Sequence, residues 1–146
     1  MSDSAVIIKK LQKFLESENS LQLAILFGSA ARNVLRPDSD IDLALQYENE
    51  LSIEEKQLLC QRLETLLQRP IDLLELQQLS GTILKEVLCN GKILLKRSSK
   101  LLFAHMQKML YHQADMMPYI RRTYLERQQR FQQEKTEEKQ FNHEIH

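Results

Sequence analysis

Two largely apolar segments, residues 21–27 and 41–45, are joined by a glycine-serine turn and a polar loop, and they constrain the fold most strongly. Each segment has the length and composition of a buried β-strand. Since side chains alternate between the two faces of a strand, we expect Asp40 and Asp42 to share one face. Carboxylates at this spacing lie about 7 Å apart along the backbone, near enough for their oxygens to converge on a cation. Such ligands suit Mg²⁺, which proteins hold with a few carboxylates and substrate phosphates.

The turn between the two segments has the composition of a phosphate-binding loop. Gly28 lets the backbone approach a ligand closely because glycine has no Cβ. Residues 30–32 are expected to start a helix, and the free N–H groups at a helix N-terminus favour phosphate. Ser29 offers a hydroxyl to a phosphate oxygen, and Arg32 either contacts phosphate or is a solvated loop residue. A phosphate-binding turn beside two carboxylates is the combination that nucleotidyl transfer needs.

The run of Gly28-Ser29, ten further residues and then Asp40-Ile41-Asp42 resembles the signature of the DNA polymerase β-type nucleotidyltransferase superfamily. Within it, the chain is most similar to the minimal nucleotidyltransferase (MNT) group, small antitoxins that pair with HEPN-domain toxins. The resemblance covers about residues 5–96. It implies an α/β (α+β) fold, with a small mixed β-sheet backed by helices.

The resemblance also implies a function. Members of the MNT group bind ATP with Mg²⁺ and transfer AMP to a hydroxyl group, typically that of a tyrosine on the toxin. This chain would then be the antitoxin of a type VII-like toxin–antitoxin system. ATP would be its substrate, two Mg²⁺ ions its cofactors, and a HEPN ribonuclease its partner in a hetero-oligomer. Gly28, Ser29 and Arg32 would bind the nucleotide.

The superfamily has a third carboxylate on a neighbouring strand, and the candidate here is Asp72. It follows Pro70, which is tolerated at the first residue of a strand. Since neighbouring strands lie about 4.8 Å apart, Asp72 can complete a site with Asp40 and Asp42. Glu75 would point to the opposite face. The resemblance implies that all three aspartates hold metal and that Asp72 can act as the general base.

Two other functions stay open. The chain can be an antitoxin without catalysis that neutralises its toxin by steric binding. Alternatively, it can be a nucleotidyltransferase whose acceptor is a small molecule or RNA. Direct nucleic-acid binding is not expected, because Lys+Arg and Asp+Glu balance at 20 each and create no global field that favours a polyanion.

Composition sets the remaining expectations. The 146 residues suit one domain with an appendage. No apolar run approaches the roughly 20 residues that a membrane span needs, and the N-terminus lacks the pattern of a signal peptide. We therefore expect a cytoplasmic protein. Cys60 and Cys89 lack metal-type spacing and are expected to be reduced core residues.

The spacing of apolar residues predicts alternating helices and strands. A first amphipathic helix covers residues 6–15, and a capping box from Ser52 to Glu55 opens a second that ends at residue 66 or 67. The Asp72 strand, residues 70–76, is followed by a helix from about residue 79 to residue 89. A glycine C-cap at Gly91 ends that helix. A short strand, residues 92–96, follows it.

The composition changes after residue 97. We expect residues 1–97 to form the minimal nucleotidyltransferase domain and residues 98–131 to form a helical extension. Methionine and arginine are enriched at interfaces, so the extension is interpreted as partner-binding. The alternative is that it covers an open face of the domain. Residues 132–146 are polar and are expected to form a flexible tail.

Overall fold

The computed structural model describes residues 3–32, 36 and 39–112 of the chain. The expectations for residues 113–146 therefore lie outside the described residues. The chain divides into two compact units, residues 1–107 and 108–146. No described helix is long and apolar enough to cross a membrane. The elements of the first unit are α1 (Asp3–Glu16), β1 (Leu21–Phe27), β2 (Ile41–Tyr47), α2 (Ile53–Leu67), β3 (Ile71–Glu75), η1 (Leu76–Gln78), α3 (Gly81–Asn90) and β4 (Lys92–Lys96).

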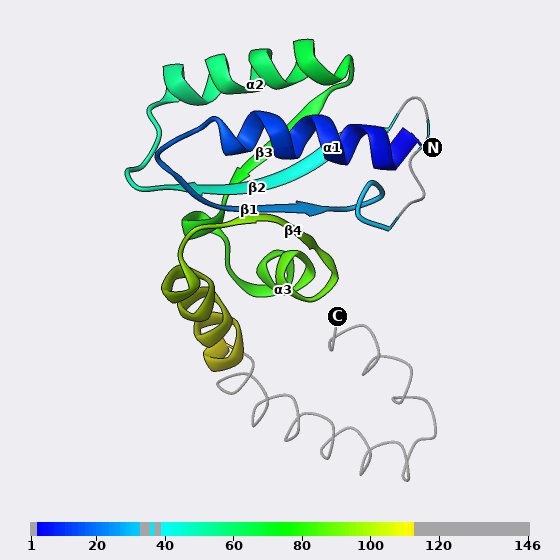
Figure 1. Cartoon of the computed structure of the whole chain (residues 1–146). Coiled ribbons are helices and arrows are strands. Elements are labelled where there is room, and N and C mark those ends of the chain that lie inside the picture. Colours follow the sequence, from blue (N-terminus) through cyan, green and yellow to red (C-terminus); the bar gives the residue numbers. More distant parts are fainter. Residues whose placement is uncertain (1–2, 33–35, 37–38, 113–146) are drawn as a thin grey trace, which may run out of the picture. The chain divides into compact units, whose positions relative to one another are not determined.

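The strands form one mixed sheet in the order β3-β2-β1-β4. β1 is antiparallel to both β2 and β4, whereas β2 is parallel to β3. The parallel pair is joined through α2, since parallel strands need a crossover connection. α1 and α2 lie on one face of the sheet and α3 lies on the other (Figure 1). The predicted small mixed sheet backed by helices is confirmed.

The main hydrophobic core lies between α1, α2 and one face of the sheet. Leu11 of α1, Leu63 of α2 and Leu43 of β2 are completely buried in it. On the other face, α3 packs against β1 and buries Leu84 and Val87. Because α3 packs on β1, the same face of β2 and β3 retains half-buried and exposed polar side chains.

The helix ends follow local chemistry. The predicted capping box is present, with the Ser52 hydroxyl accepting from the Glu55 N–H and the Glu55 carboxylate accepting from the Ser52 N–H, both at 3.1 Å. α3 begins at Gly81, later than predicted, because Leu79 and Ser80 have an extended backbone between the 3₁₀ turn of residues 76–78 and the helix. Gly91 caps α3 as expected, with its N–H bonded to Val87, although its φ of −78° is not left-handed. A Cβ there would lie 2.2 Å from the Val87 carbonyl oxygen.

Of the two cysteines, only one is close to the core. Cys60 is half-buried and packs against the main core. Cys89 is exposed on α3, so the expectation that it is a core residue is wrong. The reason is the narrow buried face of α3, which includes Val87 but not the residue two positions later.

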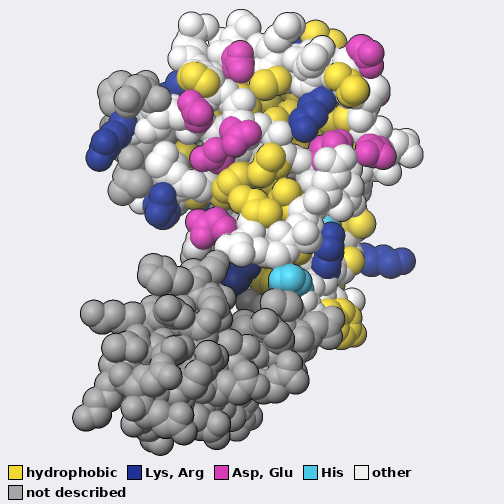
Figure 2. All heavy atoms as spheres, turned by 180° about the vertical axis from the view of Figure 1, so that it is seen from behind, with side chains coloured by type: hydrophobic (Ala, Val, Ile, Leu, Met, Phe, Trp, Pro, Cys, Tyr) yellow, Lys and Arg dark blue, Asp and Glu magenta, His cyan; other side chains and the backbone are white. Residues whose placement is uncertain are grey.

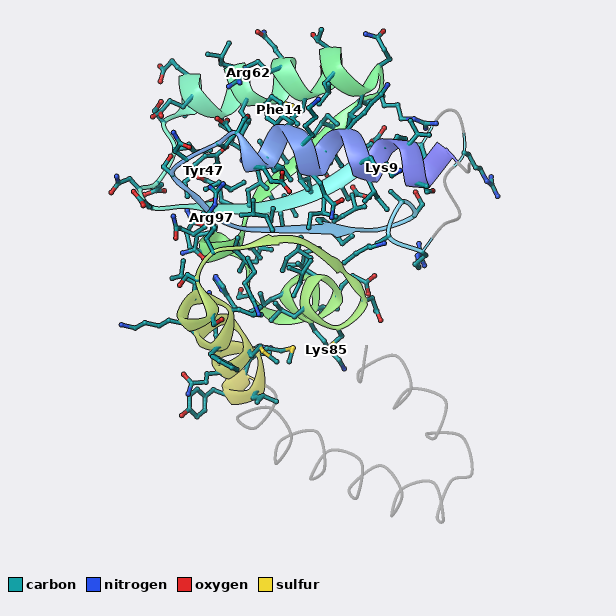
Figure 3. The ribbon with its side chains drawn as sticks, viewed as in Figure 1. Lys9, Phe14, Tyr47, Arg62, Lys85 and Arg97 are labelled. Carbon is teal, nitrogen blue, oxygen red and sulfur yellow. The ribbon has the colours of Figure 1, made fainter. Side chains whose placement is uncertain are left out.

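Two arginines fasten the elements around the end of α1 (Figure 3). Arg97, after β4, donates through Nη1 to the carbonyls of Glu18 and Leu21, the latter at 3.0 Å, and through Nη2 to that of Glu16 at 2.8 Å. Cations at a helix C-terminus are stabilising. Arg62 of α2 lies over the Phe14 ring, 4.8 Å from its centre, and pairs with Glu18 at 3.5 Å. Arg97 therefore joins the last strand to the first helix.

We expect Arg97→Met to lower the free energy of unfolding by about 2 kcal/mol, because each lost hydrogen bond contributes about 0.5–1.5 kcal/mol net. Urea unfolding followed by far-UV circular dichroism measures this change. Lys96→Met is the matched control, since Lys96 is the exposed neighbour at the end of β4. Its effect should stay within about 0.5 kcal/mol. Equal losses in the two variants would contradict the role of Arg97.

Candidate active site

Three carboxylates and a glycine turn meet at one end of the paired strands. Phe27, the last residue of β1 before the turn, is paired with Asp42 of β2, and Asp42 is paired with Asp72 of β3. Paired residues of neighbouring strands lie about 5 Å apart and point to the same face. Asp40 comes two residues before Asp42, on the segment that enters β2. The structure thus brings the three predicted aspartates together.

The carboxyl group of Asp42 is at the centre of this cluster. Burial raises the pKa of Asp42 above its ordinary value, and the negative charges of Asp72 and Asp40 raise it further. A side-chain hydrogen bond with Asp72 acts in the same direction. Asp42 is half-buried, whereas Asp40 and Asp72 are exposed. A cation bound among these carboxylates would relieve their repulsion.

Gly28 lies directly against Asp42. Its φ is +73°, in the left-handed region that glycine adopts without strain. A Cβ on Gly28 would lie 2.2 Å from Oδ2 and 3.1 Å from Cγ of Asp42. Only a residue without a side chain fits between the turn and this carboxylate. The backbone of the turn therefore lies directly beside the acidic cluster, and the predicted approach of this turn to a ligand stays a prediction.

The helix expected to start at residues 30–32 is absent there, and this expectation is wrong. Residues 28–32 form consecutive turns, with the Arg32 N–H bonded to the Ser29 carbonyl at 3.2 Å. Ser29 is half-buried and Arg32 is exposed. The nucleotide-binding roles of Gly28, Ser29 and Arg32 stay predictions.

The chemistry of the cluster fits Mg²⁺. All three side chains offer oxygen, and Mg²⁺ commonly takes one or two carboxylates, with water and substrate phosphates at its other positions. Within the described residues, no three His, Cys, Asp or Glu side chains are arranged as a complete metal site. The two predicted ions therefore stay a prediction, with Asp40, Asp42 and Asp72 as their candidate ligands.

Two further charged residues, Glu75 and Arg69, belong to β3 or to the segment just before it. Glu75 lies on the opposite face of β3 from Asp72, as expected, where it is buried and accepts a hydrogen bond from the Leu51 N–H at 3.3 Å. Arg69, which the sequence analysis did not single out, donates to two backbone carbonyls of the loop before Asp40. Its only sequence signal is its position one residue before Pro70, at the start of the strand that carries Asp72.

Charged side chains on the rear face are dispersed. In Figure 2, the Lys and Arg side chains of the described residues are scattered over the face, and acidic side chains are found among them. Continuous basic surfaces are typical of proteins that bind the phosphate backbone of nucleic acids. The face shown has no such surface among its described residues, in line with the balanced charge of the chain.

The sequence matches a known family, and the structure resembles solved complexes. A family model described as "Polymerase beta, Nucleotidyltransferase" matches residues 9–100. A search of curated proteins finds no match to this chain. A chain from a crystal structure of a toxin-antitoxin with AMP-PNP is 29% identical, with a TM-score of 0.63, and the similarity covers 80% of this chain and 97% of that chain.

Two further solved structures are similar over comparable lengths. One is a tri-AMPylated Shewanella oneidensis HEPN toxin in complex with MNT antitoxin, at 27% identity and a TM-score of 0.61, covering 82% of this chain and 98% of that chain. The other is the toxin-antitoxin MntA-HepT, at 27% identity and a TM-score of 0.56, covering 83% of this chain and 96% of that chain.

Proposed function

This chain belongs to the polymerase β nucleotidyltransferase family, and on this premise we propose that it is a Mg²⁺-dependent protein adenylyltransferase and antitoxin. Its acceptor is a tyrosine hydroxyl of a cognate HEPN ribonuclease toxin, which AMP transfer neutralises. The observation that carries the proposal is the meeting of Asp40, Asp42 and Asp72 beside the Gly28 turn. Its similarity to a MNT antitoxin in complex with an AMPylated HEPN toxin supports the choice of acceptor.

Each residue of the cluster has a distinct part in the proposed reaction. The turn at Gly28 admits the triphosphate close to the backbone, and the Ser29 hydroxyl donates to a phosphate oxygen. Asp40 and Asp42 would hold one Mg²⁺, and together with Asp72 they would hold a second. When bound, Mg²⁺ neutralises charge on the phosphates and lowers the pKa of the acceptor hydroxyl.

Asp72 is the proposed general base. It is exposed, whereas its strand neighbour Asp42 is half-buried, so an acceptor hydroxyl from outside reaches Asp72 more easily. The acceptor oxygen forms a bond to the α-phosphorus of ATP, and the bond from that phosphorus to the bridging oxygen breaks. Pyrophosphate leaves, the hydroxyl proton passes to Asp72, and AMP stays on the acceptor.

The described part of the extension offers a surface for the partner. In the helical residues 99–112, Phe103 is 63% exposed and Met106 is 40% exposed. They are three positions apart and therefore lie on one side of the helix. Exposed aromatic and methionine side chains are enriched at protein interfaces, which supports partner binding by the extension.

The test mixes the full chain with α-labelled ATP, Mg²⁺ and the purified HEPN protein encoded beside it. We expect label on the HEPN protein and, by mass spectrometry, a mass increase of one or more AMP units. Tryptic mapping should place the adduct on tyrosine, and EDTA should abolish labelling. A HEPN protein that stays unlabelled while the chain still protects cells from it would favour steric binding instead.

A further inference from the structure

We infer that Arg69 is a positioning residue that holds the chain entering β2, so that Asp40 and Asp42 stay in register with Asp72. The effect of Arg69 on catalysis rests on the proposed function, whereas its effect on the register of the aspartates does not. Arg69 lies between α2 and β3, half-buried, two residues before the strand that carries Asp72. It comes from a different part of the sequence than the loop it holds.

The Arg69 guanidinium bonds two backbone carbonyls of the chain before Asp40. Nη1 of Arg69 donates to the carbonyl of Arg36 at 2.5 Å and to that of Ser39 at 3.4 Å. Arg36 and Ser39 are themselves joined twice, by the Ser39 N–H to the Arg36 carbonyl and by the Arg36 N–H to the Ser39 hydroxyl, both at 3.0 Å. The guanidinium thus bonds both Arg36 and Ser39, and Ser39 is the residue before Asp40.

Pro70, the residue after Arg69, bonds the chain on the other side of Asp40. Its carbonyl accepts a hydrogen bond from the Ile41 N–H at 2.9 Å. Two consecutive residues therefore hold the peptide groups on both sides of Asp40. Arg69 bonds the Ser39 carbonyl before it, and Pro70 bonds the Ile41 N–H after it. Proline has a fixed φ, which makes this holding segment stiff. Asp72 follows two residues later on the same segment.

These contacts act on the register between β2 and β3. The pairing of β2 with β3 begins at Ile41 and Ile71 and places Asp42 opposite Asp72. A slip of one residue would turn one of these aspartates to the other face of the sheet. The contacts of Arg69 and Pro70 fix the pairing at its first residue, and the alignment of the carboxylates depends on that start.

Arg69 acts through the backbone rather than by pairing with the carboxylates. Among the described residues, the salt bridge found is that of Arg62 with Glu18, and none joins Arg69 to an aspartate. A guanidinium presents several N–H donors in a rigid plane, which suits it to bond more than one carbonyl. A lysine at this position keeps the charge but not the planar set of donors.

Hydrogen–deuterium exchange of the full chain, without nucleotide or partner, tests this inference. We expect Arg69→Met to speed exchange of the amides at residues 39–42 about tenfold, because the hydrogen bonds of Arg69 to the Arg36 and Ser39 carbonyls are lost. Arg69→Lys should give an intermediate rate. Arg62→Met is the control: this arginine has a 48% exposed side chain and contacts Glu18 just after α1, so the variant should leave residues 39–42 unchanged.

Binding of Mn²⁺, followed by electron paramagnetic resonance, provides a second readout. The affinity of Arg69→Met should fall about tenfold, near the low end of the roughly 10–100-fold cost of losing residues that orient metal ligands. Arg62→Met should keep the wild-type affinity, so general destabilisation alone does not account for the loss.

The inference is overturned if folded Arg69→Met or Arg69→Lys exchanges residues 39–42 at the wild-type rate. Failure of the proposed function has a different signature. In that case the wild-type chain transfers no AMP to the HEPN protein, while Arg69→Met still speeds exchange at residues 39–42.

Discussion

Asp42→Asn is expected to lower AMP transfer by about 10³-fold or more while leaving the protein folded. A metal ligand and the charge it holds are worth several kcal/mol in the transition state, and each 1.36 kcal/mol is about tenfold in rate. Asp42 is half-buried between the Gly28 turn and Asp72, so no other described carboxylate can take its place. Initial rates of label transfer to the HEPN protein measure the loss. Asp40→Asn should show a loss of the same order.

The same substitution should not destabilise the metal-free protein. The charged form of Asp42 is disfavoured by burial and by its two acidic neighbours, which is why its pKa is raised. Asparagine has nearly the same shape and removes this repulsion. In EDTA, the melting temperature of Asp42→Asn should therefore equal or exceed that of the wild type. If activity falls while the melting temperature is retained, the loss comes from the missing metal-binding carboxylate and not from unfolding.

Glu75→Gln is the matched control. Glu75 is also an acidic residue of the sheet, but it lies on the face opposite Asp72 and its carboxylate accepts from the Leu51 N–H. Glutamine keeps an acceptor oxygen for that bond, so transfer should stay within about twofold of the wild type. If Asp42→Asn and Glu75→Gln transfer AMP equally well, the acidic cluster is not the active site. If Asp42→Asn loses transfer but protects cells fully, neutralisation is steric.

The strands of the site were predictable because their signals are local. β1 and β2 are short apolar runs, and the period of two in a strand predicts the face of Asp42 without further information. Asp40 was expected on the same strand face but precedes β2, which begins at Ile41, so its shared face stays a prediction. Asp72 is different, since its pairing with Asp42 depends on a crossover through α2. Periodicity alone does not set which strands become neighbours, and only the family resemblance pointed to Asp72.

The features that the sequence analysis missed depend on distant contacts or on backbone geometry. Arg69 reaches a carbonyl 33 residues away in the sequence, and no local pattern signals such a bond. The helix expected at residues 30–32 is replaced by turns. Apolar alanines after a glycine-serine pair suit a helix by propensity, but the left-handed φ of Gly28 turns the chain back toward Asp42.

Gly28→Ala is expected to lower AMP transfer about 100-fold and the free energy of unfolding by at least about 1–2 kcal/mol. A left-handed φ costs a residue with a Cβ about 1–2 kcal/mol. In addition, the new methyl group would lie 2.2 Å from Oδ2 of Asp42, so that carboxylate must move. A misplacement of about 1 Å at reacting groups can cost about 10² in rate. Steady-state transfer rates and urea unfolding measure the two effects.

Gly81→Ala separates backbone strain from the collision with Asp42. Gly81 also has a left-handed φ, +61°, but it begins α3 and is not the glycine that touches Asp42. Both variants should lose stability from strain, whereas only Gly28→Ala should lose transfer per folded molecule and affinity for Mn²⁺. Equal transfer by the two variants would mean that Asp42 tolerates displacement, and the close approach of the turn would then be a packing feature rather than part of the active site.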